Sequence, residues 1–204
     1  MPFITSIKPQ KFRTRVNIYL DGKFGFGLDL ENFVKLGLMA GQELTDEKIL
    51  EITQKGEYQK VWDRLLVFAT LRPRSEKEIN DWMIRKKVNT DYKNKLAEKL
   101  CKLELIDDEK FAKWWVGQRL AFKKKSLRDL NYELRGKGIK KEIIEKVLST
   151  SEINEEQAAK DLIEKRAYKW KGLGRVERRQ KISRYLAGKG FGWETIKKVL
   201  GTSN

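Results

Sequence analysis

A segment of this chain repeats itself at a spacing of about fifty residues, and this repetition limits the possible folds more than any single motif. The stretch KKKSLRDLNYELRGKGIKKEIIEKVL at residues 123–148 matches RRQKISRYLAGKGFGWETIKKVL at residues 178–200 after a shift of 52 positions. A weaker copy, RSEKEINDWMIRKKV at residues 74–88, aligns after a shift of 51 positions in the other direction. Self-similarity at a fixed period of this length indicates an array of supersecondary units.

Each copy predicts two helices separated by a turn, which is a glycine turn in the two stronger copies. Ser75 with Glu78, and Ser126 with Asp129, form capping boxes, in which the hydroxyl accepts a first-turn N–H and the carboxylate bonds back to the chain. Apolar residues then recur at helical spacing. The segment 136–138 ends the first helix, since glycine adopts the left-handed conformation at helix ends without steric cost, and a second helix follows.

An acidic sequence opens the second and third copies, IDDEKF at residues 106–111 and INEEQA at residues 153–158. Asp107 and Asn154 are natural N-cap residues, and the acids behind them face the positive end of the helix dipole. Asp107, Asp108 and Glu109 have an alternative interpretation as a metal-binding or acid–base cluster. We prefer the helix start, because the later copy keeps the capping residue and lacks a histidine companion.

Aromatic residues follow the acidic start of the second copy. Phe111, Trp114 and Trp115 recur at helical spacing, which predicts that they belong to a core. The alternative is a platform on which nucleic-acid bases stack, and one exposed tryptophan of the adjacent pair would fit either interpretation.

The N-terminal segment has a different pattern, with residues 3–28 alternating as in β-strands. Asp21-Gly22 is a strong hairpin-turn signal, and the glycines of FGFG at 24–27 indicate strand positions that another backbone approaches closely. A short helix at about 30–36 should end at Gly37. Thr45 should cap a further helix that breaks near Gly56.

Together these patterns predict a mainly α fold: a tandem array of three-helix, helix-turn-helix-like repeats with a small N-terminal extension that contains a β-hairpin. The expected divisions are residues 1–56 for the α+β extension, 57–106 for repeat 1, 107–153 for repeat 2 and 154–204 for repeat 3. Three short helices bury little apolar surface alone, so neighbouring repeats are expected to stack.

The net charge is the strongest compositional signal. The chain has 45 basic and 29 acidic residues, a formal charge of +16, of which residues 1–60 contribute +1. A surplus concentrated on the repeats implies a polyanionic partner or a nucleoprotein surface. The alternative is a lysine-rich surface that serves solubility.

Localisation and chemistry follow from what the sequence lacks. No apolar run reaches the roughly 18 residues of a membrane span, and the N-terminus has no signal pattern, so we expect a cytoplasmic protein that does not bind membranes.

Cys101 is the single cysteine of the chain, and its apolar neighbours predict a packing role. The absence of histidine removes imidazole catalysis and His-containing zinc sites. Without a P-loop motif as well, we expect no enzyme activity, no cofactor and no metal site, which leaves binding.

The basic side chains near the repeated helices form three clusters, one in each repeat. Lysine and arginine there suit phosphate contacts, which give salt-dependent affinity without sequence preference. The alternative is that they are solvated helix faces without a partner. The candidate binding residues are Arg72 and Arg74 in repeat 1, Lys123, Lys124, Lys125, Arg128 and Arg135 in repeat 2, and Lys171, Arg175, Arg178, Arg179, Lys181 and Arg184 in repeat 3.

Four motifs together resemble the RecX family: RPRSEKEI at 72–79, LIDDEKFA at 105–112, ELRGKGI at 133–139 and RRQKISRYLAGKGF at 178–191. The segments LDGKFGFGLD and GLMAGQEL are similar to the N-terminal extension of longer family members. The resemblance implies a monomeric regulator of the recombinase RecA, built from tandem three-helix repeats. Such a protein binds the RecA–single-stranded DNA filament and suppresses ATP hydrolysis, strand exchange and repressor co-cleavage, which modulates recombination and the SOS response.

The family offers no catalytic residues to carry over, so the basic clusters remain the candidate site. An alternative from another class is direct, helix-turn-helix-type binding to duplex DNA, although EIIEKVL and ETIKKVL offer few base-reading side chains. A protein-only adaptor is a third possibility, and its binding should barely weaken with salt. Duplex DNA is expected to bind only weakly if the resemblance holds.

Overall fold

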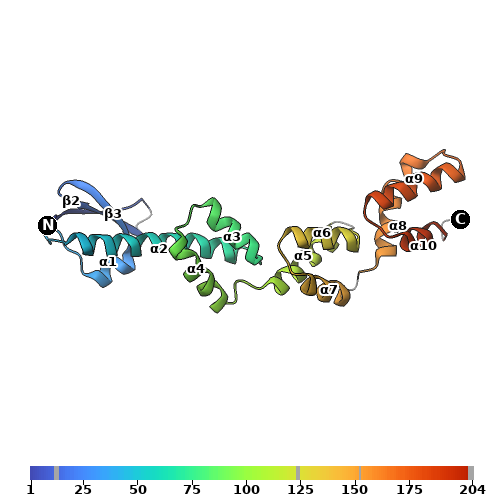
Figure 1. The fold of residues 1–204 in the computed structure, drawn as a ribbon. Helices are drawn as coiled ribbons and strands as arrows, with labels where there is room; N and C mark the ends of the chain where they lie inside the picture. The colour runs from blue at the N-terminus through green and yellow to red at the C-terminus, as the bar shows by residue number, and fades with distance from the viewer. Residues whose placement is uncertain (12–13, 123–124, 152, 202–204) are drawn as a thin grey trace. The chain divides into compact units, whose positions relative to one another are not determined.

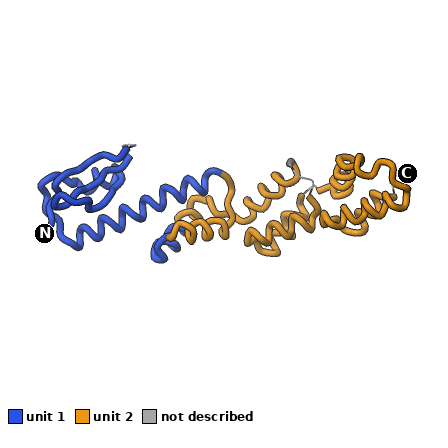
Figure 2. Tube along the Cα trace, turned by 90° about the horizontal axis from the view of Figure 1, so that it is seen from above, with its two compact units in different colours: residues 1–71, 88–98 blue, residues 72–87, 99–204 orange. Residues whose placement is uncertain are grey.

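A computed structural model describes residues 1–11, 14–122, 125–151 and 153–201 (Figure 1). Lys123 and Lys124, two of the candidate binding residues, lie outside this part of the chain. The structure divides into two compact units, residues 1–71 with 88–98 and residues 72–87 with 99–204 (Figure 2).

The first unit contains a three-stranded antiparallel sheet of β1 (Ile4–Pro9), β2 (Arg15–Leu20) and β3 (Lys23–Asp29), in the order β1-β2-β3. The predicted hairpin turn is confirmed: Asp21 and Gly22 have φ angles of 48° and 80°, as the favoured two-residue turn requires. Apolar residues of the strands meet Leu38, Leu44 and Ile52 in one core. The alternation read from the sequence therefore identifies the buried face.

Helix α1 (Leu30–Leu36) ends at Gly37, with φ 58°, as predicted. Helix α2 (Asp46–Thr70) is capped by Thr45, whose hydroxyl accepts a bond from the Lys48 N–H, but it runs straight through Gly56. The predicted break there is wrong. A Cβ at Gly56 would lie 2.9 Å from the Gly27 carbonyl oxygen. Glycine costs about 1 kcal/mol inside a helix, and here it permits close packing of α2 on β3.

The remaining helices follow the repeat pattern. They are α3 (Glu76–Arg85) and α4 (Thr90–Lys102), then α5 (Asp108–Phe122), α6 (Leu127–Gly136) and α7 (Lys141–Thr150), and finally α8 (Glu155–Lys165), α9 (Arg175–Gly188) and α10 (Trp193–Gly201). A short 3₁₀ turn, η1 (Ala167–Trp170), separates α8 from α9. The fold class read from the sequence, mainly helical with a small N-terminal sheet, is confirmed.

Repeats 2 and 3 each have a core of their own. In repeat 2, Phe111, Leu130 and Ile144 bring α5, α6 and α7 together, and the two adjacent tryptophans pack partly buried against this core. In repeat 3, residues of α8, η1, α9 and α10 form the corresponding core around Trp170 and Leu186. The tryptophan pair is thus a core element, as its spacing predicts.

The structure also bears on the predictions for Cys101 and for membrane-spanning segments. Cys101 is exposed, so its predicted packing role is wrong: it lies on the outer face of α4, while Leu96 and Leu100 are buried. In the described ranges, no helix combines the length and apolarity needed to cross a membrane.

Candidate functional site

The serines that cap α3 and α6 also bind the repeat that follows each helix. The Ser75 hydroxyl accepts a bond from the Glu78 N–H (3.2 Å) and donates one to the Lys137 carbonyl (2.9 Å). The Ser126 hydroxyl does the same with the Asp129 N–H (3.2 Å) and the Lys189 carbonyl (3.0 Å). We call these contacts the first joint, between α3 and repeat 2, and the second joint, between repeats 2 and 3.

A carboxylate from the following repeat completes each joint. Asp108, at the start of α5, accepts the Glu76 N–H at 2.9 Å, and Glu155, at the start of α8, accepts the Leu127 N–H at 2.7 Å. Both N–H groups are first-turn donors that lack a partner within their own helix. The acidic residues at the starts of repeats 2 and 3 therefore cap the preceding repeat, a role that the sequence pattern had not revealed. Burial raises the pKa of Asp108, against the lowering effect of its bond from Glu76.

The GKG triplets fit these joints because their last glycine has two constraints. Gly138 and Gly190 have φ angles of 82° and 80°, which favour glycine. A Cβ at Gly138 would lie 2.7 Å from Cβ of Lys77, and one at Gly190 would lie 2.6 Å from Ser126 Oγ. Lys87, the equivalent residue after α3, has φ 52°.

An ion cluster strengthens the first joint. Glu78 accepts two bonds from Arg72, at 2.8 and 3.0 Å, and one from the Lys137 ammonium at 2.7 Å. Burial alone would raise the pKa of Glu78, but the bonds from Arg72 and Lys137 outweigh it and lower the pKa. Arg74 lies 3.9 Å from the same carboxylate. A charge-assisted cluster of this kind fixes the orientation of two helices.

A second ion cluster lies inside repeat 2. Glu133 accepts bonds from the Trp115 indole N–H (2.8 Å) and Arg119 (2.6 Å), and Lys125 lies 3.2 Å from it. Burial would raise the pKa of Glu133, yet these donors lower it overall. The Arg119 guanidinium also lies 4.2 Å from the centre of the Trp115 ring. The ring of Trp115 therefore carries a cation on its face, as does that of Trp114, which lies 5.1 Å from Arg72.

The candidate binding residues have two different environments. Those near the joints are partly buried in ion pairs: Arg72 and Arg74 around Glu78, and Lys125 with Asp129 at 3.1 Å. These ion pairs within the chain account for the partly buried positions of the three side chains, and partner binding by them stays a prediction. The others in the described part of the chain are exposed, namely Arg128 and Arg135 on α6, Lys171 before α9, and Arg175, Arg178, Arg179, Lys181 and Arg184 on α9.

Helices α6 and α9 thus present the exposed candidates, and Lys181 forms an exposed pair with Glu177 on the same helix. Tyr132, which is 80% exposed, lies between Arg128 and Arg135 at spacings of four and three residues, on the same face of α6. Basic and aromatic side chains in this arrangement suit a phosphate backbone with unstacked bases. The sequence pattern could have revealed Tyr132, since exposed positions between two arginines follow from the same helical spacing.

These features define a class: a tandem three-helix-repeat protein whose repeats are fastened by recurrent serine and carboxylate caps and whose second helices carry exposed arginines. Comparison with known proteins gives the family. The model of the "Regulatory protein RecX N-terminal domain" matches residues 2–45, and those of the second and third RecX three-helix domains match residues 107–148 and 154–200.

The regulatory protein RecX of Bacillus subtilis (strain 168) is 34% identical over 202 residues, which cover 98% of this chain and 76% of the relative. RecX of Listeria innocua is 32% identical over 197 residues, 95% of this chain and 73% of the relative. A crystal structure of regulatory protein RecX has a TM-score of 0.70 at 27% identity and covers 98% of both chains. The chain belongs to the RecX family of regulatory proteins. RecX from Lactobacillus salivarius shares the fold, with a TM-score of 0.64 at 23% identity over 71% of this chain and 95% of that one.

Proposed function

We propose that this protein binds the RecA–single-stranded DNA filament and inhibits its ATPase, strand-exchange and co-protease activities, and so modulates recombination and the SOS response. It acts as a monomer and without catalysis of its own. Membership of a family of regulatory proteins supports this function. The structural observation that carries it is the exposed basic surface of α6 and α9, on repeats that the second joint holds together.

A protein that inhibits a filament by binding must prefer one state of that filament over another. The second joint gives the arginines of α6 and α9 a defined separation, because hydrogen bonds from Ser126 and Glu155 fasten repeat 2 to repeat 3. A fixed separation matches a polymer whose phosphates or protomers repeat at one spacing. A filament that changes its spacing loses part of these contacts, and this differential affinity is the source of inhibition.

The test is charge reversal on α9. Arg178→Glu, Arg179→Glu and Arg184→Glu together should abolish inhibition of RecA's DNA-dependent ATPase without unfolding the chain, since all three side chains are exposed. The matched control reverses Lys140, Lys141 and Lys197, exposed residues at or on α7 and α10, the equivalent third helices. Both variants change the charge equally, so a loss confined to the first assigns the contact to α9.

Unchanged ATPase inhibition by the α9 variant would eliminate these arginines as contacts. A gel shift on duplex DNA without RecA tests the alternative of direct duplex-DNA binding, because tight, sequence-dependent binding in that assay would favour it. Helix α7 gives that alternative little support: Lys146 is bonded to Glu109 at 2.7 Å, and Lys141 lies 3.6 Å from Glu145.

A further inference from the structure

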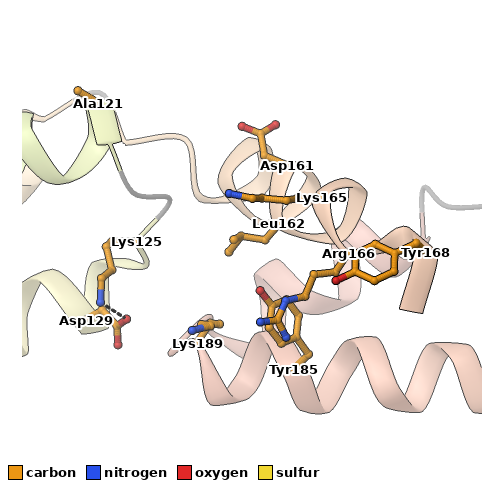
Figure 3. A pocket seen from close by; sticks show the side chains of 10 residues that line it. All are labelled: Ala121, Lys125, Asp129, Asp161, Leu162, Lys165, Arg166, Tyr168, Tyr185 and Lys189. Atoms are coloured by element: carbon orange, nitrogen blue, oxygen red, sulfur yellow. Dashed lines mark hydrogen bonds and ion pairs between the residues drawn. The ribbon is translucent and has the colours of Figure 1, made fainter. Parts of the chain in front are cut away.

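The second joint contains a cleft of about 610 Å³ that the proposed function does not use (Figure 3). Lys125 and Asp129 line it from repeat 2, and Lys165, Arg166, Tyr168 and Lys189 are among the residues that line it from repeat 3. Its volume falls within the range of small-ligand sites, roughly 300–1,000 Å³. The cleft is therefore large enough for a nucleotide unit of a longer chain.

Cations dominate this cleft. Figure 3 shows the ammonium groups of Lys165 and Lys189 pointing toward the side of the cleft where Lys125 and Asp129 lie, whereas the guanidinium of Arg166 lies over the ring of Tyr185. The carboxylate of Asp161 points the other way, and its Oδ1 accepts a bond from Gln157 at 2.7 Å. Within the described ranges, no carboxylate forms an ion pair with Lys165, Arg166 or Lys189. In the described part of the chain, Lys165, Arg166 and Lys189 thus share the cleft without an ion pair of their own, and two carboxylates, those of Asp129 and Asp161, line it as well.

The first joint shows what a closed version of this arrangement looks like. There Lys137, the central residue of the first GKG triplet, donates to Glu78 at 2.7 Å. The equivalent residues at the second joint are Lys189 and Asp129. The Asp129 side chain is one methylene shorter than that of glutamate, and its carboxylate forms an ion pair with Lys125 at 3.1 Å. Within the described ranges, the Lys137–Glu78 ion pair of the first joint therefore has no counterpart between Lys189 and Asp129, which leaves the Lys189 ammonium available to an external anion.

Aromatic groups indicate which anion fits. The Arg166 guanidinium lies 4.6 Å from the centre of the Tyr185 ring. This contact holds the N–H donors of the guanidinium in a fixed plane. Tyr168 is 70% exposed at the edge of the cleft. An exposed ring beside phosphate-binding cations is the combination that single-stranded nucleic acids require, since bases stack on the ring while phosphates meet the cations. An acidic peptide offers carboxylates to the cations but no nucleobase to stack on the ring.

We propose that this cleft binds one or two nucleotides of single-stranded DNA, with the phosphate held by Lys165, Arg166 and Lys189 and a base stacked on Tyr168. This inference extends the proposed function, because it names the part of the nucleoprotein filament that the second joint contacts. Its test, however, requires no RecA.

The experiment measures binding of a short fluorescent oligothymidylate to the full chain by anisotropy, over a series of salt concentrations. Lys165→Gln, Arg166→Gln and Lys189→Gln together should weaken binding at least about tenfold and reduce the slope of log affinity against log salt by about 0.7–1.4, since each neutralised phosphate of a single strand contributes about 0.7 and the cleft holds one or two. Tyr168→Ala should weaken binding roughly 5- to 100-fold and leave the salt slope unchanged, because stacking releases no counterions. A control variant with Lys140, Lys141 and Lys197 changed to Gln loses the same charge outside the cleft.

Equal affinity of the triple cleft variant and the control variant would overturn the proposal. So would an unchanged affinity after Tyr168→Ala, or displacement of the oligothymidylate by polyglutamate at equal charge concentration, since both would indicate a site for any polyanion. The two proposals fail separately. If the triple cleft variant loses oligothymidylate binding but still inhibits RecA, the cleft binds DNA and the regulatory contact lies elsewhere. If that variant keeps oligothymidylate binding but no longer inhibits RecA, the cleft is not the DNA site, whereas the proposed regulatory function is not contradicted.

Discussion

Gly190→Ala tests whether the second joint depends on the close approach of the GKG turn to Ser126. A residue other than glycine at φ 80° costs about 1–2 kcal/mol, part of which is offset by about 0.5–1 kcal/mol of reduced unfolded-chain entropy. The new Cβ would also lie 2.6 Å from Ser126 Oγ and 2.9 Å from Asp129 Oδ1. Displacing the serine removes its N-terminal cap of α6, which costs about 1 kcal/mol of stability. It also removes the hydrogen bond to the Lys189 carbonyl, which costs about 1 kcal/mol more. We expect a total destabilisation of about 3 kcal/mol.

A double-mutant cycle separates the two causes. Ser126→Ala alone removes the cap and the bond between repeats and should cost about 2 kcal/mol. In that background the atom nearest to the new Cβ is absent, so Gly190→Ala should cost the backbone contribution of about 1 kcal/mol and a small displacement of the Asp129 side chain, whose Oδ1 lies 2.9 Å from the new Cβ. The two substitutions should therefore be coupled by about 2 kcal/mol.

The assay is urea unfolding followed by circular dichroism, together with hydrogen exchange of the Asp129 amide, which loses its bond to Ser126 in both variants. Gly188→Ala is the matched control: it lies in the last turn of α9, no atom lies within 4 Å of its added Cβ, and it should stabilise the chain by up to about 1 kcal/mol. Equal costs of Gly190→Ala with and without Ser126 would refute the close approach as the cause. A large cost of Gly188→Ala would refute the distinction between the two glycines.

Two further predictions concern α3 and the first joint. Lys87→Gly should raise the free energy of unfolding by about 0.5–1 kcal/mol in urea, because relief of the left-handed strain exceeds the entropy that glycine adds to the unfolded chain; a lower stability would contradict the strain. Glu78 has a folded pKa below its unfolded value of about 4.5, so its stabilisation is complete above that value and is lost as the pH falls through the folded pKa. Urea titrations from neutral pH downward should therefore show a steeper loss below pH 4.5 for the unaltered chain than for Glu78→Gln, and parallel losses would count against the ion cluster.

Much of the fold follows from local patterns in the sequence. The serine and acidic caps place the starts of α3, α5, α6 and α8, and the GKG turns place the ends of α6 and α9, within a few residues of the observed bounds. Gly56 shows where local rules fail, because its cost to the helix is offset by a contact with Gly27, 29 residues away in the sequence. A propensity describes a residue's own segment, whereas that contact depends on which segments meet in the folded chain.

The site was predictable to a lesser degree for the same reason. Sequence spacing shows that Lys137 and Lys189 coincide, yet it does not show that the first lies against Glu78 while the second faces an open cleft. Similarly, Arg72 and Arg178 are both basic residues in the candidate clusters. Only the structure separates the ion-paired side chain from the exposed one. Charge can be counted from a sequence, but its availability to a partner depends on packing.

The joints also bear on the proposed function, in which this chain regulates a filament by binding alone. Each exposed arginine contributes little by itself, and an array of independent contacts would lose much of its energy to the ordering of the repeats on binding. The caps from Ser126 and Glu155 order repeats 2 and 3 in advance, so that this cost is already met by folding. Affinity for the filament should then depend on the stiffness of the joint as well as on the charge of α6 and α9. A loosened joint with every arginine intact should bind more weakly and discriminate less between filament states, because a flexible pair of repeats can follow a polymer as its spacing changes.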